Sequence, residues 1–255
     1  MYGRGVIENE DDNPPSDDDG NNNDCGMAVC QVDKHQIWQR FSDTPMWYGP
    51  PVGNRIEFRL FYNAGSRSQS AVIGYGNVGE QWSHSWQRYY RGGNPGGVFM
   101  NGGVATFSWD GSGFNNNITQ VSRLYKTSAG YELRGADGSR RLFETGVGKQ
   151  PTEPTAICFL TADIDAQGNR TRFEYDGNNR LVRVVDALGR ATQLVYGHSA
   201  KIRNMYLVTE VRDPFGRSTK LSYDERWRLV SITDMIGLVS RFTYEDILSE
   251  GGGVY

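Results

Sequence analysis

The sequence predicts an all-β protein made of antiparallel hairpins, and two observations favour this class. Glycine supplies 32 of the 255 residues, aromatic residues 12% and hydrophobic residues only 37%, a mixture typical of short strands joined by many turns. In the second half of the chain, an aspartate, a glycine and a tyrosine recur at fixed spacing among alternating polar and apolar residues. A chain of this length has room for one large domain or two ordinary ones.

The N-terminal residues 1–24 predict a disordered, acidic leader. Residues 8–24 hold eight acids and no lysine or arginine. Such a segment cannot offset the entropy lost on ordering, so a solvated leader is the simpler interpretation, and a regulatory or partner-binding tail is the alternative. Residues 25–255 then carry 26 basic and 22 acidic side chains, without the basic stripe that is typical of a nucleic-acid-binding protein.

Residues 25–150 predict an irregular β module. Ile56, Phe58, Leu60 and Tyr62 occupy every second position, which is the period of a half-buried strand. The segment before this strand contains three prolines and must be extended or turned.

Later parts of this module carry further strand and turn signals. Trp82, His84 and Trp86 would share one face of a second strand. Residues 92–103 contain six glycines and one proline, which predicts a loop. Asp-Gly pairs between apolar runs are strong hairpin signals, and they occur at residues 110–111 and 137–138.

An internal repeat dominates residues 151–255. Each unit has an aspartate, a glycine three residues later and a tyrosine seven residues after the glycine. Successive units are spaced by 21, 27 and 21 residues, and the longer spacing contains an insertion at 198–205, as expected at a hairpin tip. The four units are Asp165, Gly168 and Tyr175; Asp186, Gly189 and Tyr196; Asp213, Gly216 and Tyr223; and Asp234, Gly237 and Tyr244.

Each unit has the pattern of one β-hairpin with a buried face and a solvated face. An apolar residue and a threonine or serine lie two and four positions before each tyrosine, on the same strand face. Leu181–Val185 and Leu229–Thr233 predict returning strands. We expect the aspartate to accept hydrogen bonds from backbone N–H groups two or three residues on, and the glycine to adopt a backbone angle that other residues resist. Since a lone hairpin is marginal in water, the units must stack edge to edge in one curving sheet.

The pattern Gly-x6-Tyr-Asp-x3-Arg-Leu resembles the YD repeat of the bacterial Rhs family. It occurs at residues 168–181 and 216–229, while the second unit has Tyr196-Gly197 with an insertion and the fourth has Tyr244-Glu245. The front of the chain also resembles the N-terminal module of Rhs proteins. That resemblance rests on the segments 43–53 (DTPMWYGPPVG), 79–86 (GEQWSHSW) and 131–143 (YELRGADGSRRLF).

This resemblance implies a non-enzymatic, structural and interaction protein. Members of the family wind many such hairpins into a hollow shell of spiralling β-sheet that encloses a variable C-terminal toxin, and some are delivered by type VI or other secretion systems. Four repeats cannot enclose a cavity, and the family's C-terminal core has no match here. We therefore expect the leading part of a shell, or a short copy, whose partners are further YD repeats, a toxin domain and secretion-system components.

Location can be approached only from the absence of targeting signals. The sequence has no run of 18 apolar residues and no apolar core at its start, so we expect neither a membrane span nor a cleavable signal peptide. The resemblance implies a protein that is cytoplasmic before export and then secreted or cell-associated by a route without such a peptide.

No catalytic set or cofactor site is predicted from the acids and histidines. His84 lies between two tryptophans and has the pattern of a packed strand residue rather than a catalytic base. Asp163 and Asp165 could share a face, as a carboxylate pair for glycoside hydrolysis would require. Because Asp165 is the turn residue of the first repeat unit, the structural interpretation is favoured.

No metal site is predicted either. Cys25, Cys30 and His35 could form a zinc site with Cys158 as a distant fourth ligand. Their spacing is wider than that of a zinc knuckle, and the first of them adjoins the acidic leader, so unpaired or incidentally oxidised thiols are the expectation.

The aromatic residues suggest the alternative function, a cell-surface or secreted module that binds a carbohydrate or another partner. Strand aromatics usually pack in a core, and the repeat tyrosines have the parity of the buried face. Trp47 and Tyr48 lie in a segment between prolines, and they are the cluster that we expect to be exposed and to contact a ligand.

Overall fold

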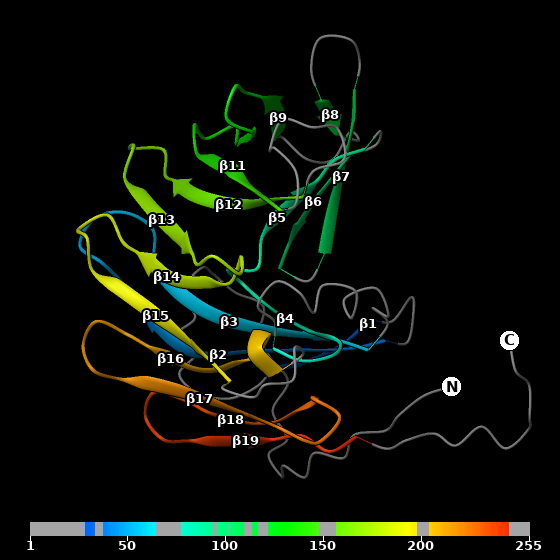
Figure 1. The fold of residues 1–255 in the computed structure, drawn as a ribbon, viewed down its shortest axis with the longest axis vertical. Helices are drawn as coiled ribbons and strands as arrows, with labels where there is room; N and C mark the ends of the chain where they lie inside the picture. Colours follow the sequence, from blue (N-terminus) through cyan, green and yellow to red (C-terminus); the bar gives the residue numbers. More distant parts are fainter. Residues whose placement is uncertain are drawn as a thin grey trace, which may run out of the picture.

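The computed structural model describes residues 29–33, 38–64, 78–93, 96–101, 103–109, 114–116, 122–147, 157–197 and 204–244. The predicted all-β class is confirmed, since these residues form antiparallel strands and one short 3-10 helix, η2 (Asn204–Tyr206) (Figure 1). Within these ranges, no helix has the length and apolar character needed to cross a membrane.

A four-stranded sheet, here the front sheet, comes first in the chain. Its strands pair in sequence order: β1 (Val29–Asp33), β2 (Trp38–Tyr48), β3 (Ile56–Asn63) and β4 (Trp82–His84). The predicted alternation in β3 is confirmed, because Ile56, Phe58 and Leu60 are each at most 3% exposed. Strand β2 contains a bulge between Asp43 and Met46, where a proline, which has no backbone N–H, can be accommodated.

All later strands belong to a second, fifteen-stranded sheet, here the long sheet. Its first eight strands are β5 (Tyr89–Arg91), β6 (Gly96–Met100), β7 (Gly103–Trp109), β8 (Phe114–Asn116), β9 (Arg123–Lys126), β10 (Tyr131–Arg134), β11 (Arg140–Val147) and β12 (Ile157–Ile164). The repeat supplies the rest: β13 (Arg170–Tyr175), β14 (Leu181–Val185), β15 (Ala191–Tyr196), β16 (Val208–Arg212), β17 (Ser218–Tyr223), β18 (Leu229–Thr233) and β19 (Val239–Arg241).

Strand β12 joins the repeat to the strands that precede it. Its first residues pair with β5, its last residues pair with β13, and β11 lies along most of its length. The long sheet therefore contains strands from both sides of residue 150, the expected boundary between the front module and the repeats.

The repeat hairpins have the two faces that the sequence predicts. Phe173, Leu194 and Leu221 are at most 6% exposed, and the threonines of the same face are buried beside them. The opposite face carries exposed charged side chains, including Arg172 and Lys220. The turns that join β14 to β15, β16 to β17 and β18 to β19 lie one below another along the left side of Figure 1.

The front sheet packs on the buried face of the repeats (Figure 1). The β2 bulge directs the carbonyl oxygen of Pro45 toward the hairpins, where it accepts hydrogen bonds from Thr219 Oγ1 at 2.9 Å and from Met235 N at 3.0 Å. Trp82 Nε1 donates to Tyr244 Oη at 2.8 Å. The front sheet thus covers side chains that the hairpins would otherwise expose.

Residues 92–103 were expected to form a loop, and that expectation is wrong. They contain β6 and the start of β7, which meet in a tight turn at Asn101 with φ 51°. Packing explains why residue 96 of this strand is a glycine. A Cβ atom there would lie 2.5 Å from the Tyr90 hydroxyl oxygen. The predicted Asp137-Gly138 hairpin is confirmed between β10 and β11, with Gly138 at φ 88°. The expected hairpin at 110–111 lies outside the described residues.

Candidate functional site

The aspartate and glycine of the repeat form one recurrent turn, and the tyrosine ends the strand that follows it. In the unit that begins at Asp186, the carboxylate Oδ1 accepts hydrogen bonds from the backbone N–H groups of Leu188 and Arg190, both at 2.9 Å. The contacts are two and four residues on, rather than the expected two or three. Gly189 has φ 84°, in the left-handed region that favours glycine. The same bonds recur at Asp165, Asp213 and Asp234, with Gly168, Gly216 and Gly237 at φ 84° to 92°.

A cation or an amide closes the turn in three of the four units. Arg190 Nε donates to Asp186 Oδ2 at 2.7 Å, and Arg217 Nε donates to Asp213 Oδ2 at 2.6 Å. Asn169 Nδ2 has this role in the first unit. Burial alone would raise the pKa of the Asp186 carboxyl, but the backbone N–H and guanidinium of Arg190 outweigh it and hold that pKa below its usual range.

The opposite ends of the hairpins have a second aspartate-capped turn. Asp176 caps the turn between β13 and β14, and Asp224 caps the turn between β17 and β18. Arg180 Nε and Arg228 Nε each donate to the aspartate four residues before at 2.7 Å. The Asp-x3-Arg spacing, present in both kinds of turn, was the available signal for these arginine partners.

Each repeat tyrosine ties its strand to the preceding hairpin. Tyr196 Oη donates to the carbonyl oxygen of Leu181, fifteen residues earlier, at 2.7 Å. Tyr175, Tyr223 and Tyr244 make the same bond to Leu160, Val208 and Leu229. Arginines from the second turn also cover two of these rings, with Arg180 4.9 Å from the Tyr196 centroid and Arg228 4.9 Å from that of Tyr244.

The structure places Trp47 and Tyr48 against the repeats. Tyr48 is 6% exposed, its hydroxyl donates to Asp186 Oδ2 at 3.3 Å, and its ring packs edge-on against Phe215. Exposure of Tyr48 was therefore predicted wrongly, because contacts distant in sequence cover it. Trp47 is half-buried, and the Arg55 guanidinium lies 3.9 Å from its ring centroid. Ligand contact by these side chains stays a prediction.

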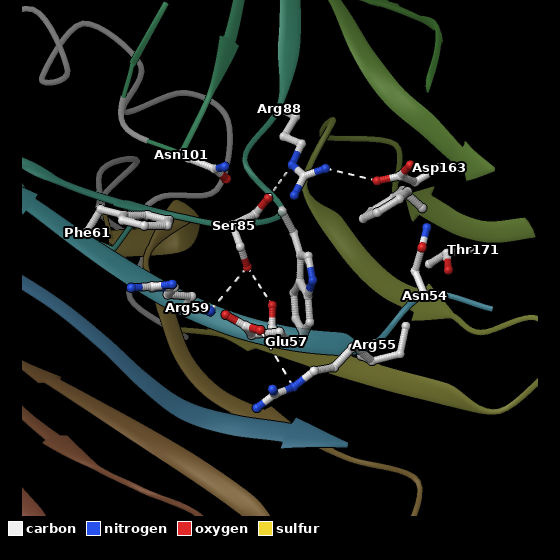
Figure 2. Close-up of a pocket in the computed structure, with 13 residues that line it drawn as sticks. Asn54, Arg55, Glu57, Arg59, Phe61, Ser85, Arg88, Asn101, Asp163 and Thr171 are labelled. Carbon is white, nitrogen blue, oxygen red and sulfur yellow. Dashed lines mark hydrogen bonds and ion pairs between the residues drawn. The ribbon is translucent and has the colours of Figure 1, made fainter. Parts of the chain in front are cut away.

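A polar pocket of about 260 Å³ lies where β3, the turn after β4 and the strands β12 and β13 meet (Figure 2). Asn54, Arg55, Arg59 and Phe61 line it from the front sheet. Asn101, Ser85, Arg88, Asp163 and Thr171 line it from the long sheet and its connections.

Ion pairs and hydrogen bonds organise one wall of this pocket. Arg88 Nη1 lies 2.9 Å from Asp163 Oδ2, which also contacts Arg141 Nε at 3.4 Å. Asp163 therefore pairs with two arginines, whereas Asp165 caps the turn of the first repeat unit. Two buried polar atoms at the pocket have no partner among the described residues: Arg59 Nε and Thr171 Oγ1.

The described residues do not bring histidine and cysteine side chains together in one cluster. His84 is 2% exposed and packs 5.4 Å from the Phe58 ring. Cys158 is fully buried, and burial raises the pKa of its thiol to about 11. The described ranges contain no group of three or more potential metal ligands. Cys25, His35 and the side chain of Cys30 lie outside the described part, as does His198.

Comparison with known proteins identifies a related family and a related fold. Residues 160–191 match the family model described as RHS Repeat. A chain in the crystal structure of TcdB2-TccC3 has a similar fold, with a TM-score of 0.54 and 13% sequence identity. The similarity covers 85% of the present chain but only 16% of the TcdB2-TccC3 chain. At this identity the likeness concerns the fold alone. Altogether 23 chains of solved structures match, and the curated proteins gave no match.

Replacing the left-handed glycine of one turn tests its role. We expect Gly189→Ala to lower the free energy of unfolding by about 1 kcal/mol, because alanine resists the left-handed φ of 84°. The added Cβ would meet no atom within 4 Å, so the loss reports backbone strain and not a steric clash. Gly177→Ala is the matched control, since its Cβ also meets nothing within 4 Å and Gly177 has no positive φ. Urea denaturation measures both variants, and an equal loss in the two would contradict the assigned role.

Proposed function

We propose that this chain, whose residues 160–191 match the RHS Repeat family model, is a non-enzymatic part of a β-shell wall that encapsulates or delivers a C-terminal polymorphic toxin. The supporting observation is the edge-to-edge pairing of β13 to β19, in which each hairpin is the template for the next. In this proposal residues 1–24 are an acidic leader, residues 25–150 an N-terminal module and residues 151–255 the wall. Export without a signal peptide and contact with secretion-system components belong to the same proposal.

Strand β19 supports a further repeat as the direct partner. Among the described residues it pairs with β18 only, so its other edge offers unpaired backbone groups. Two apolar side chains at and before this edge are also exposed: Leu238 by 50% and Val239 by 43%. A neighbouring hairpin would pair with that backbone and cover those side chains.

Self-association through β19 tests the wall proposal. We expect the apparent mass from light scattering to rise with concentration, and Val239→Lys to reduce the rise because a lysine disfavours edge pairing. Gln193→Lys is the control, since Gln193 is exposed on β15 and pairs with Arg183 on one side and Arg212 on the other. A monodisperse monomer at all concentrations would contradict the proposal, as would equal effects of the two lysines.

Carbohydrate binding is the second candidate function, and the pocket in Figure 2 is the observation that favours it. Asn54 and Asn101 line the pocket, and their amides can both donate to and accept from sugar hydroxyls. Phe61 and Trp86 add aromatic rings to the lining. Trp47 is connected to this pocket through Arg55, which lines it and covers the Trp47 ring.

A glycan array tests this second candidate. We expect saturable binding of a glycan that weakens roughly tenfold in Asn54→Ala, because one or two hydrogen bonds of about 1 kcal/mol each are lost. Trp47→Ala should weaken binding as well, without loss of fold by circular dichroism. Asn178→Ala, an exposed asparagine in the β13–β14 turn, should leave binding unchanged. Absence of binding across the array would exclude this function.

A further inference from the structure

The pocket in Figure 2 contains more positive than negative charge. Its charged lining residues are three arginines and two acids: Arg55, Arg59, Arg88, Glu57 and Asp163. A fourth arginine, Arg141, contacts Asp163 but does not belong to the lining. Four guanidinium groups therefore accompany two carboxylates, which leaves an excess of two positive charges at the pocket.

Two guanidinium groups share one carboxylate on the long-sheet wall of the pocket. Arg88 Nη1 lies 2.9 Å and Arg141 Nε 3.4 Å from the same atom, Asp163 Oδ2. The side chains of Arg88 and Asp163 are only 17% and 14% exposed, so water compensates little of the remaining positive charge. Burial lowers the pKa of the Arg88 guanidinium, and the charge of Arg141 acts in the same direction. An anion beside Arg88 would oppose both effects.

On the front-sheet wall, Arg59 of β3 forms no ion pair with any residue that the structure describes. Its Nη2 donates to the Ser42 hydroxyl at 3.1 Å, and its Nε is buried without an acceptor among these residues. The neighbouring carboxylate of Glu57 is paired with Arg55, whose Nε lies 3.6 Å from Glu57 Oε2. The uncompensated charge of this wall is therefore that of Arg59.

Hydrogen-bond donors suited to a negatively charged oxygen also line the pocket. Arg88 uses its Nε and Nη1 in hydrogen bonds, whereas its Nη2 makes none within the described ranges. Thr171 is 4% exposed, and its hydroxyl has no partner in the same ranges. The amides of Asn54 and Asn101 can donate as well. Carboxylate and phosphate oxygens accept such bonds, and they bind most strongly to guanidinium groups.

We infer that this pocket binds a small molecule through a carboxylate or phosphate group, whose negative charge offsets the excess positive charge of Arg59 and Arg88. The volume of about 260 Å³ lies below the range typical of drug-sized ligands, so it suits one small molecule. In a partly buried pocket the attraction between the ligand and the guanidinium groups is stronger than in water. The inference concerns the charge of the ligand and requires neither the wall function nor the carbohydrate-binding function proposed above.

Three sugars that differ only at C6 test the inference on the full-length protein: glucose, glucuronate and glucose 6-phosphate. We expect isothermal titration calorimetry to show that one of the two acids binds about tenfold more tightly than glucose, because a charge-assisted hydrogen bond is stronger than a neutral one. The tighter acid identifies the group as carboxylate or phosphate. Competition by acetate or inorganic phosphate at similar concentration would support an anion site without a sugar. Equal affinity for the three sugars would overturn the inference and leave carbohydrate binding in place, whereas absence of binding by all five probes would overturn it outright.

Two substitutions with opposite effects on charge locate the site. Arg59→Gln removes a positive charge and should weaken binding of the tighter acid about tenfold. Glu57→Gln removes a negative charge and should strengthen it, and this variant keeps the test open if Arg59→Gln does not fold, since Glu57 is 30% exposed and its ion pair is 3.6 Å long. Arg172→Gln is the control, because Arg172 is exposed on the opposite face of β13 from Thr171. Changes of the same sign in Arg59→Gln and Glu57→Gln, or an equal loss in Arg172→Gln, would contradict the inference.

Discussion

The aspartate-capped turn is the constraint on which the hairpins depend. Its carboxylate satisfies two backbone N–H groups, and the glycine in the left-handed region lets the chain reverse into the next strand. This turn sets the register of each strand pair, and a slip of one residue would move every buried side chain to the solvated face. The tyrosine bond to a carbonyl fifteen residues earlier, as from Tyr196 to Leu181, is possible only in that register.

The front sheet covers the apolar face that the hairpins alone would leave exposed to solvent. One face of β13 to β19 is apolar, and a single curving sheet cannot bury its own face. The bulge at Pro45 directs a backbone carbonyl toward Thr219, so that the packed face also has its polar groups satisfied. The repeats and the front sheet therefore share one hydrophobic core.

The local structure could be predicted from the sequence, and the docking could not. The turns, the buried parity and the strands Leu181–Val185 and Leu229–Thr233 follow from periodicity and turn chemistry, which depend on neighbours in the chain. Tyr48 is buried by contact with Asp186, 138 residues away, and a local pattern carries no information on such pairs. The glycines of β6 were misleading for a similar reason, since the packing of Gly96 against Tyr90 is a tertiary requirement.

Native-state hydrogen exchange at the capped turns is the most direct test of whether they hold the repeats in one cooperative unit. The informative amides are those of Leu188, Phe215 and Ile236, which donate to the aspartates. We expect them to exchange with the same opening free energy as the strand amides of β14 to β17, because the turn cannot open without loss of register. Exchange as fast as in an unstructured turn, with the strands still protected, would contradict the central role of the turn.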